Sequence, residues 1–148
     1  MTTPVLRPAP STEAEDAPVL PASIREAIVR HAVACYPLEA CGLIVADTEG
    51  NLRMAYPLTN AEASPTRFTL DAREHFGAVC HAESRGWDIA GVFHSHPAGS
   101  AVPSATDIAQ VHPADWVHFV VGLRPSVQLK AWRLADGTAR ELRLLESE

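Results

Sequence analysis

The chain has few lysines, few aromatic residues and few cysteines, and it lacks any long apolar run. Its 148 residues carry a formal charge of −6, and Lys130 is its single lysine, beside scattered arginines. Without a basic stripe, the sequence gives no indication of nucleic-acid or membrane binding. No stretch of about 18 apolar residues is present, which argues against a membrane span. The composition instead predicts one soluble domain with a sizeable hydrophobic core.

The three cysteines, Cys35, Cys41 and Cys80, form no C-x-x-C pair. An odd number without paired spacing argues against a disulfide scaffold and against a cysteine-only zinc site. We therefore expect three small buried thiols in a reducing compartment. The N-terminus also lacks a basic segment followed by an apolar block, which argues against a signal peptide. The expected location is the cytoplasm, and the oligomeric state cannot be read from the sequence.

Proline is concentrated at the start of the chain, where five prolines and three acidic residues fall within the first 21 positions. Such a composition cannot bury enough apolar surface to fold. Residues 1–20 are therefore expected to be a disordered Pro-rich tail, and residues 21–148 are expected to form the folded domain.

Apolar periodicity and turn residues predict a mixed succession of helices and strands. Helices are expected over residues 22–35, 71–85 and, for one short helix, 104–111. Strands are expected over residues 41–46, 52–56, 68–70, 89–93, 116–121, 127–134 and 139–145. This order predicts the α/β class, with a single curved mixed β-sheet flanked by helices.

Two histidines, a serine and an aspartate follow the predicted strand 89–93 at close spacing. The order is His94-Ser95-His96, seven residues, and then Ser104 followed three positions later by Asp107. Residues two apart on a strand face the same side, so both imidazoles can reach one ion. Two imidazoles and a carboxylate suit Zn²⁺, although the ligands alone also admit iron. Three protein ligands leave a fourth position for water, which is typical of a hydrolytic site.

Each part of this pattern also has a plain structural interpretation. Two histidines at this spacing can be ordinary residues at a sheet edge. Ser104 can be the N-cap of the short helix, with Asp107 in its first turn. The two interpretations of Ser104 are compatible, because a capped helix start can still direct Asp107 at a metal ion.

Hydrolysis by a metal-activated water also requires a base. Zinc lowers the pKa of bound water from about 15.7 to roughly 7, which brings it within reach of a carboxylate. Glu39 is the best candidate, because it lies between the helix stop at Pro37 and the buried strand 41–46. A charge that enters a core strand needs a partner. The other glutamates considered fall on expected helix or loop surfaces: Glu26, Glu62, Glu74 and Glu83.

These residues together resemble the signature of the JAMM/MPN+ (Mov34/MPN/PAD-1) metallopeptidase family, an upstream glutamate with H-x-H-x7-S-x2-D. The resemblance covers roughly residues 21–145. Three blocks look most like the bacterial CysO-cysteine peptidase-like stand-alone members: residues 36–42, 59–65 and 93–96. The family implies that His94, His96 and Asp107 ligate zinc. It also implies that Glu39 is the general base and that Ser104 donates a hydrogen bond to the oxyanion.

The resemblance further implies the substrate. We expect a zinc metallopeptidase or isopeptidase that hydrolyses an amide at the C-terminal Gly-Gly of a ubiquitin-like sulfur-carrier protein, for example releasing cysteine. The compact chain has little room for the insertions by which eukaryotic deubiquitinases grip ubiquitin. An extended tail can add as a strand beside the active site, with the segment 59–70 as one wall.

Two other functions are compatible with parts of the sequence. A catalytically silent MPN-type module would bind proteins without cleaving them, but such modules usually lack part of the ligand set and this chain lacks none. A zinc hydrolase of small molecules, such as a nucleoside deaminase, would need H-x-E with P-C-x-x-C. No pair of cysteines in this chain has that spacing.

Overall fold

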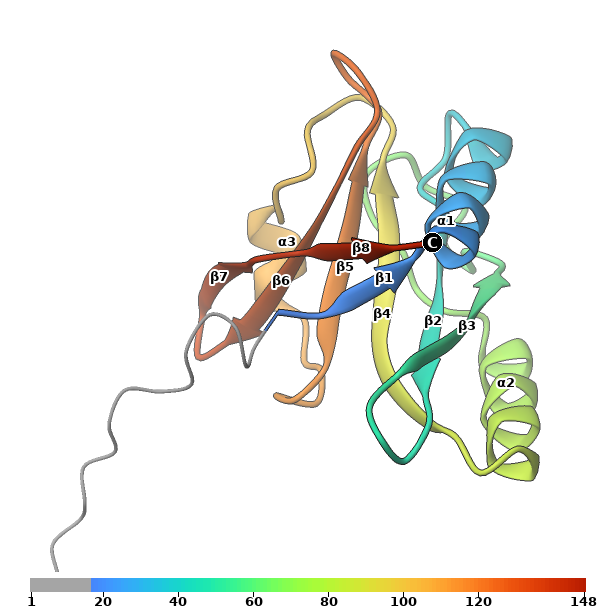
Figure 1. Cartoon of the computed structure of the whole chain (residues 1–148). Helices are drawn as coiled ribbons and strands as arrows, with labels where there is room; N and C mark the ends of the chain where they lie inside the picture. Colours follow the sequence, from blue (N-terminus) through green and yellow to red (C-terminus); the bar gives the residue numbers. More distant parts are fainter. Residues whose placement is uncertain (1–16) are drawn as a thin grey trace, which may run out of the picture.

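A six-stranded mixed sheet forms the centre of the computed structural model, which describes residues 17–148 (Figure 1). The strand order is β3-β2-β4-β5-β6-β7. All neighbouring pairs are antiparallel except β4 and β5, which are parallel. The strands are β2 (Cys41–Ala46), β3 (Leu52–Leu58), β4 (Asp88–His96), β5 (Val117–Gly122), β6 (Gln128–Ala135) and β7 (Thr138–Leu142). The predicted α/β class and the single mixed sheet are thus confirmed.

The first long helix, α1 (Ala22–Cys35), has the predicted bounds and covers one face of the sheet. Its apolar residues Ile24, Ile28 and Ala32 recur at helical spacing and are buried. They pack in one cluster with Ile44 of β2 and Phe93 of β4. Full burial of each isoleucine side chain contributes about 1.5–3 kcal/mol.

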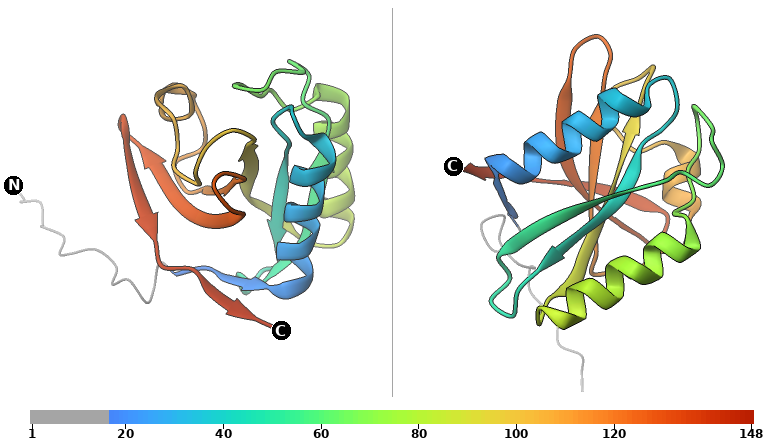
Figure 2. Two further views of the ribbon diagram at one scale, coloured as in Figure 1. Left: turned by 90° about the horizontal axis from the view of Figure 1, so that it is seen from above. Right: turned by 90° about the vertical axis from the view of Figure 1, so that its right-hand side faces the viewer.

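Two further helices cover the opposite face, because consecutive residues of a strand alternate between faces. The helix α2 (Ala72–Ser84) packs through Ala78 on Leu43, the neighbour of Ile44. The short helix α3 (Ala105–Ala109) packs through Ile108 beside Trp132 of β6. The two long helices lie at the β2–β3 end of the sheet, and α3 lies toward β5 and β6 (Figure 2). Strand β2 is buried along its whole length because both of its faces are covered.

A parallel pair cannot be joined by a tight turn, so the chain between β4 and β5 makes a long crossover. Residues 97–116 form this connection and contain α3. The crossover starts at the end of the sheet where β4 finishes and where the segment between α1 and β2 also lies (Figure 1). His94 and His96 are the last residues of β4 with side chains on the α2 and α3 face. The topology therefore brings both segments to one end of the sheet.

A second sheet has two strands, β1 (Val19–Pro21) and β8 (Leu145–Ser147), which pair in parallel. Leu20 is fully buried among the residues that α1 covers. Of the expected tail, residues 1–20, positions 1–16 lie outside the described residues. The first strand, β1, begins at Val19, two residues before the expected start of the folded domain at residue 21. Long-range pairing with β8 explains the difference, because an isolated Pro-flanked triplet has no strand signal of its own.

The structure differs from the sequence predictions at three other places. The expected strand 68–70 is an irregular segment with one isolated bridge, between Asn60 and Leu70. The expected strand 139–145 is divided between β7 and β8. Cys80 lies exposed on α2, whereas Cys41 is buried as expected and Cys35 is partly buried. Within residues 17–148, no helix has both the length and the apolar character needed to cross a membrane.

Candidate metal centre

The end of β4 places two imidazoles side by side. His94 is almost fully buried and His96 is partly exposed. Their Nε2 atoms are 3.2 Å apart, as expected for side chains two positions apart on one strand face. Ser95 points to the other face, where its hydroxyl accepts a hydrogen bond from the Ala40 amide at 2.8 Å.

The third member of the group comes from the first turn of α3. The Oδ2 atom of Asp107 lies 3.0 Å from Nε2 of His94 and 3.0 Å from Nε2 of His96. Atoms that bind one tetrahedral zinc ion at ~2.0–2.1 Å lie ~3.3 Å from each other, close to these separations. The donor set and its spacing therefore fit a divalent ion. The three residues form a group that can hold a metal.

The hydrogen bond of the His96 ring indicates which of its two nitrogens is free to bind a metal ion. His96 donates from Nδ1 to the carbonyl oxygen of Ser100 at 2.9 Å, which leaves the lone pair of Nε2 for a metal ion. Nδ1 of His94 is buried and has no hydrogen-bond partner among the described residues. The His94 ring stacks instead on Phe68, with the ring centres 4.7 Å apart and the planes 21° from parallel.

The charge of Asp107 is held in place by its surroundings. Burial alone would raise the pKa of this carboxyl, but the adjacent rings of His94 and His96 and the hydrogen bond from the Ser104 amide outweigh burial and hold the pKa well below its usual range. Burial lowers the pKa of His94, which favours the neutral, metal-binding imidazole. An anionic oxygen and neutral imidazoles are the forms that ligate zinc.

Ser104 is the N-cap of α3, as one interpretation of the sequence held. Its Oγ accepts a hydrogen bond from the Asp107 amide at 3.1 Å, and Asp107 Oδ2 accepts one from the Ser104 amide at 2.8 Å. A hydroxyl has two lone pairs and one hydrogen, so the cap uses only an acceptor position. The O–H of Ser104 is left to donate elsewhere, and the two interpretations do not compete.

Glu39 lies beside this group in a cleft between two segments of the chain. The cleft has a volume of about 270 Å³ and is called the Ser104 cleft below. It is lined by Glu39, Pro65, Thr66, His96, Pro97, Ala98, Gly99, Ser100, Val102 and Ser104. The segment 59–70 forms one wall through Pro65 and Thr66, and the start of the β4–β5 crossover forms the other. All five residues singled out from the sequence therefore meet at one end of the sheet.

The carboxylate of Glu39 is buried without compensation. Only 3% of the residue is exposed, and its Oε1 has no hydrogen-bond partner within residues 17–148. Burial raises the pKa of Glu39 to about 8, with a smaller lowering effect from His96 and a smaller raising effect from Asp107. A carboxylate that accepts a proton readily at neutral pH has the property a general base requires.

Two backbone hydrogen bonds hold Glu39 in position, and one of them comes from Asn60, which was not among the candidate site residues. The side-chain amide of Asn60 donates to the Glu39 carbonyl at 3.1 Å and to the Arg67 carbonyl at 2.9 Å. The amide of Glu39 donates to the Ser64 carbonyl at 2.9 Å. Phe68 was not predicted to belong to the site either. The expected strand over residues 68–70 gave no indication that the Phe68 ring contacts His94. Only the Thr59-Asn60 block, noted for its resemblance, pointed toward this segment.

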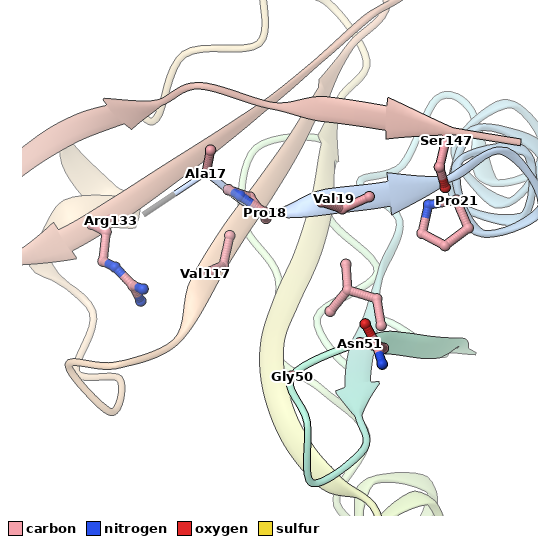
Figure 3. A pocket seen from close by; sticks show the side chains of 10 residues that line it. Ala17, Pro18, Val19, Pro21, Gly50, Asn51, Val117, Arg133 and Ser147 are labelled. Atoms are coloured by element: carbon pink, nitrogen blue, oxygen red, sulfur yellow. The ribbon is translucent and has the colours of Figure 1, made fainter. Parts of the chain in front are cut away.

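A different cavity lies at the opposite end of the sheet. It measures about 350 Å³ and is lined by residues of β1, the β2–β3 turn and β6, among them Val19, Asn51 and Arg133 (Figure 3). Its lining contains no histidine or cysteine among the described residues. Among residues 17–148, the group of His, Cys, Asp or Glu side chains placed to hold a metal ion is His94, His96 and Asp107, where β4 finishes.

Similarity to known proteins agrees with this geometry. The family model described as prokaryotic homologs of the JAB domain matches residues 21–135. The chain is 35% identical over 127 residues to the CysO-cysteine peptidase of Mycobacterium tuberculosis, covering 83% of this chain and 86% of that protein. It is 31% identical over 129 residues to the desampylase of Haloferax volcanii, covering 83% and 91%.

Solved structures show the same fold. A protein of Desulfitobacterium hafniense superposes with a TM-score of 0.79 at 30% identity, covering 88% of this chain and 92% of that one. A JAB1/MPN domain protein of Archaeoglobus fulgidus superposes with a TM-score of 0.57 at 19% identity, covering 87% and 98%. The fold, the His-His-Asp group and the match of the family model over most of the chain lead to one conclusion: the chain belongs to the JAMM/MPN family, among the prokaryotic homologs of the JAB domain.

Proposed function

We propose that the protein is a zinc-dependent peptidase that hydrolyses the amide bond after the C-terminal Gly-Gly of a ubiquitin-like sulfur-carrier protein. The observation that carries the proposal is the unpaired carboxylate of Glu39 in the same cleft as His96, beside three metal-type ligands that converge. Relatives named for cleaving CysO-cysteine and for desampylation support a small protein tail as the substrate class. Cytoplasmic location stays a prediction from the sequence.

The roles of the residues follow from their positions. His94, His96 and Asp107 would hold the ion, which when bound supplies a Lewis acid that acidifies water and polarises the scissile carbonyl. Glu39 takes a proton from the attacking water and delivers it to the leaving amine. Ser104 donates its free O–H to the developing oxyanion. Stabilisation of this charge depends on a hydrogen-bond donor that is already in position in a partly buried site. Removal of one such donor typically costs about 10²–10³ in rate.

The alternative of a catalytically silent binding module has less support. A module that only binds has no use for a buried carboxylate whose pKa is raised to about 8 by burial, because that burial costs stability. The complete set of Glu39, Ser104 and three ligands in one place favours catalysis over docking alone.

The test is the variant Glu39→Gln, assayed on a ubiquitin-like carrier that bears cysteine after its Gly-Gly. We expect this variant to retain bound metal by elemental analysis and to lose at least about 10²-fold in kcat, the usual contribution of a general base. Mass spectrometry of the carrier reports cleavage. Glu83→Gln, at an exposed position of α2, is the matched control and should cleave at the wild-type rate. Full activity of Glu39→Gln would refute the mechanism, and carrier binding without cleavage by the metal-loaded protein would support the silent module.

A further inference from the structure

A second, larger pocket lies near the metal-type group and shares no lining residue with the Ser104 cleft. Its volume is about 670 Å³, and we call it the Phe68 pocket. Its lining includes Phe68, Leu70, His75, Gln110, His112 and Trp116. It lies between the same two segments as the Ser104 cleft, the later part of 59–70 on one side and the later part of the β4–β5 crossover on the other.

The Phe68 pocket adjoins the metal ligands through two residues of its own wall. Phe68 lines the pocket and stacks on the ring of His94. Gln110 lines it too, and its amide donates to the carbonyl of Asp107 at 3.3 Å while its side chain donates to the carbonyl of Phe68 at 3.5 Å. The Phe68 pocket therefore adjoins His94 and Asp107, whereas the Ser104 cleft is lined by His96.

The Ser104 cleft and the Phe68 pocket differ in the parts of a substrate that each can accommodate. The Ser104 cleft is small and is lined on one side by Pro97, Ala98 and Gly99, which leaves room for an extended chain without side chains. Gly-Gly is such a chain. The first substrate residue that carries a side chain then lies on the amine side of the scissile bond, and it needs the larger volume.

The chemistry of the Phe68 pocket selects among such side chains. No Asp, Glu, Lys or Arg is among the described residues that line it. Burial, and then the neighbouring His94, lower the pKa of His112, which disfavours the charged form of this imidazole. Aromatic and aliphatic surface from Phe68, Leu70 and Trp116 favours apolar groups, and a wall without carboxylate, lysine or arginine side chains offers little compensation for a buried charge.

We propose that the Phe68 pocket binds the residue on the amine side of the scissile bond and selects a neutral, apolar side chain there. This inference rests on the proposed function and adds its leaving-group specificity. Phe68 then has two tasks, because it supports the ring of His94 on one face and contacts the leaving group as part of the pocket wall.

The test uses ubiquitin-like carriers that end in Gly-Gly and are extended by the dipeptide X-Ala. With X as Leu or Phe, we expect kcat/KM to exceed that for Asp or Arg by at least about ten-fold, because a site that rejects an unpaired buried charge discriminates by this order. Equal kcat/KM for all X would overturn this inference alone. No cleavage of any carrier by the metal-loaded protein would overturn the proposed function, and this inference with it.

A variant connects the preference to the pocket. Val111 lines the Phe68 pocket and is 96% exposed, so Val111→Glu introduces a carboxylate without disturbing the core. We expect the ratio of kcat/KM for Arg over Leu to rise about three-fold, the size of a solvent-exposed charge interaction. Val19→Glu makes the same change beside the remote cavity of Figure 3, where Val19 is 47% exposed, and should leave the ratio unchanged. An unchanged ratio in Val111→Glu would place the amine-side residue elsewhere.

Discussion

In the proposed mechanism, Ser104 combines a structural and a chemical task in one hydroxyl group. Its oxygen caps α3 and thereby fixes Asp107 in the first turn, while its hydrogen remains available to a substrate. Capping also positions the carboxylate that faces the two imidazoles. A helix start and a candidate metal ligand are therefore built from the same four residues, Ser104 to Asp107, so the cap interpretation and the metal-ligand interpretation are compatible.

The two tasks of Ser104 can be separated by a matched pair of variants. Asp71 caps α2 in the same way, since its side chain accepts from the Glu74 amide at 3.0 Å, but it lies outside the Ser104 cleft. We expect Ser104→Ala and Asp71→Ala each to lower the free energy of unfolding by about 1 kcal/mol. Only Ser104→Ala should also lower kcat, by about 10²-fold or more. Urea unfolding and carrier cleavage measure the two effects, and an equal loss of kcat in both variants would show that Ser104 acts only as a cap.

At the scale of elements, the site depends on how closely the β4–β5 crossover lies against β5. Gly122 ends β5, and a Cβ atom at this position would overlap backbone atoms of Ser100 and Ala101. Ser100 is the residue whose carbonyl accepts from Nδ1 of His96. The absence of a side chain at Gly122 therefore lets the loop approach β5 and orient His96, a candidate metal ligand.

This close approach predicts the effect of Gly122→Ala. Overpacking against backbone should cost about 1–3 kcal/mol of unfolding free energy. Displacement of Ser100 should also weaken metal binding by about 10-fold or more, the usual cost of losing an outer hydrogen bond to a ligand. Gly77→Ala in α2 is the control, because no atom lies within 4 Å of the added Cβ, and it should stabilise the protein by about 0.5–1 kcal/mol. Chelator competition gives the affinity, and unchanged affinity in Gly122→Ala would contradict the role given to this loop.

At the scale of the whole molecule, the sheet separates stability from chemistry. The largest apolar cluster lies under α1 and includes Leu20, Phe93 and Phe119. The candidate ligands His94 and His96 lie on the opposite face, which α2 and α3 cover. No long helix covers the end of β4 on this face within the described residues. Buried polar groups such as Glu39 and His118 occur at this end or on this face, and they lower the stability that the apolar cluster provides.

The cost of burying Glu39 predicts a pH dependence of stability. Burial raises its pKa from an ordinary 4.5 to about 8. The folded chain then retains a proton that the unfolded chain releases as the pH rises above about 4.5, so stability is lost between these two values. In metal-stripped protein, Glu39→Gln should match the wild type near pH 4.5 and exceed its unfolding free energy by about 3 kcal/mol at about pH 7.

Denaturant unfolding at both pH values measures this difference. Glu83→Gln, at an exposed position, should show no change in stability relative to the wild type at either pH. If the difference in unfolding free energy between Glu39→Gln and the wild type were the same at both pH values, the pKa of Glu39 would not be raised in the folded protein.

The sequence pattern predicted the bounds of those elements that depend on neighbouring residues alone. The bounds of α1 and β2 agree with the prediction, because helical spacing and a continuous apolar run each depend on neighbouring residues. The pairing of β1 with β8 and the irregular course of residues 68–70 had no such signal. Contacts between residues far apart in the chain decide them, and propensity gives way to such contacts.

The sequence by itself determined which residues can bind a metal, because the strand period places His94 and His96 on one side and the helix start places Asp107 after them. Only the tertiary structure decided that Glu39, more than fifty positions earlier in the chain, faces the same cleft, and that Phe68 supports a ligand ring. The physical reason is that ligand type and spacing are properties of a short segment. The burial that raises the pKa of Glu39 and the shapes of the Ser104 cleft and the Phe68 pocket arise only when the crossover, the segment 59–70 and the sheet pack together.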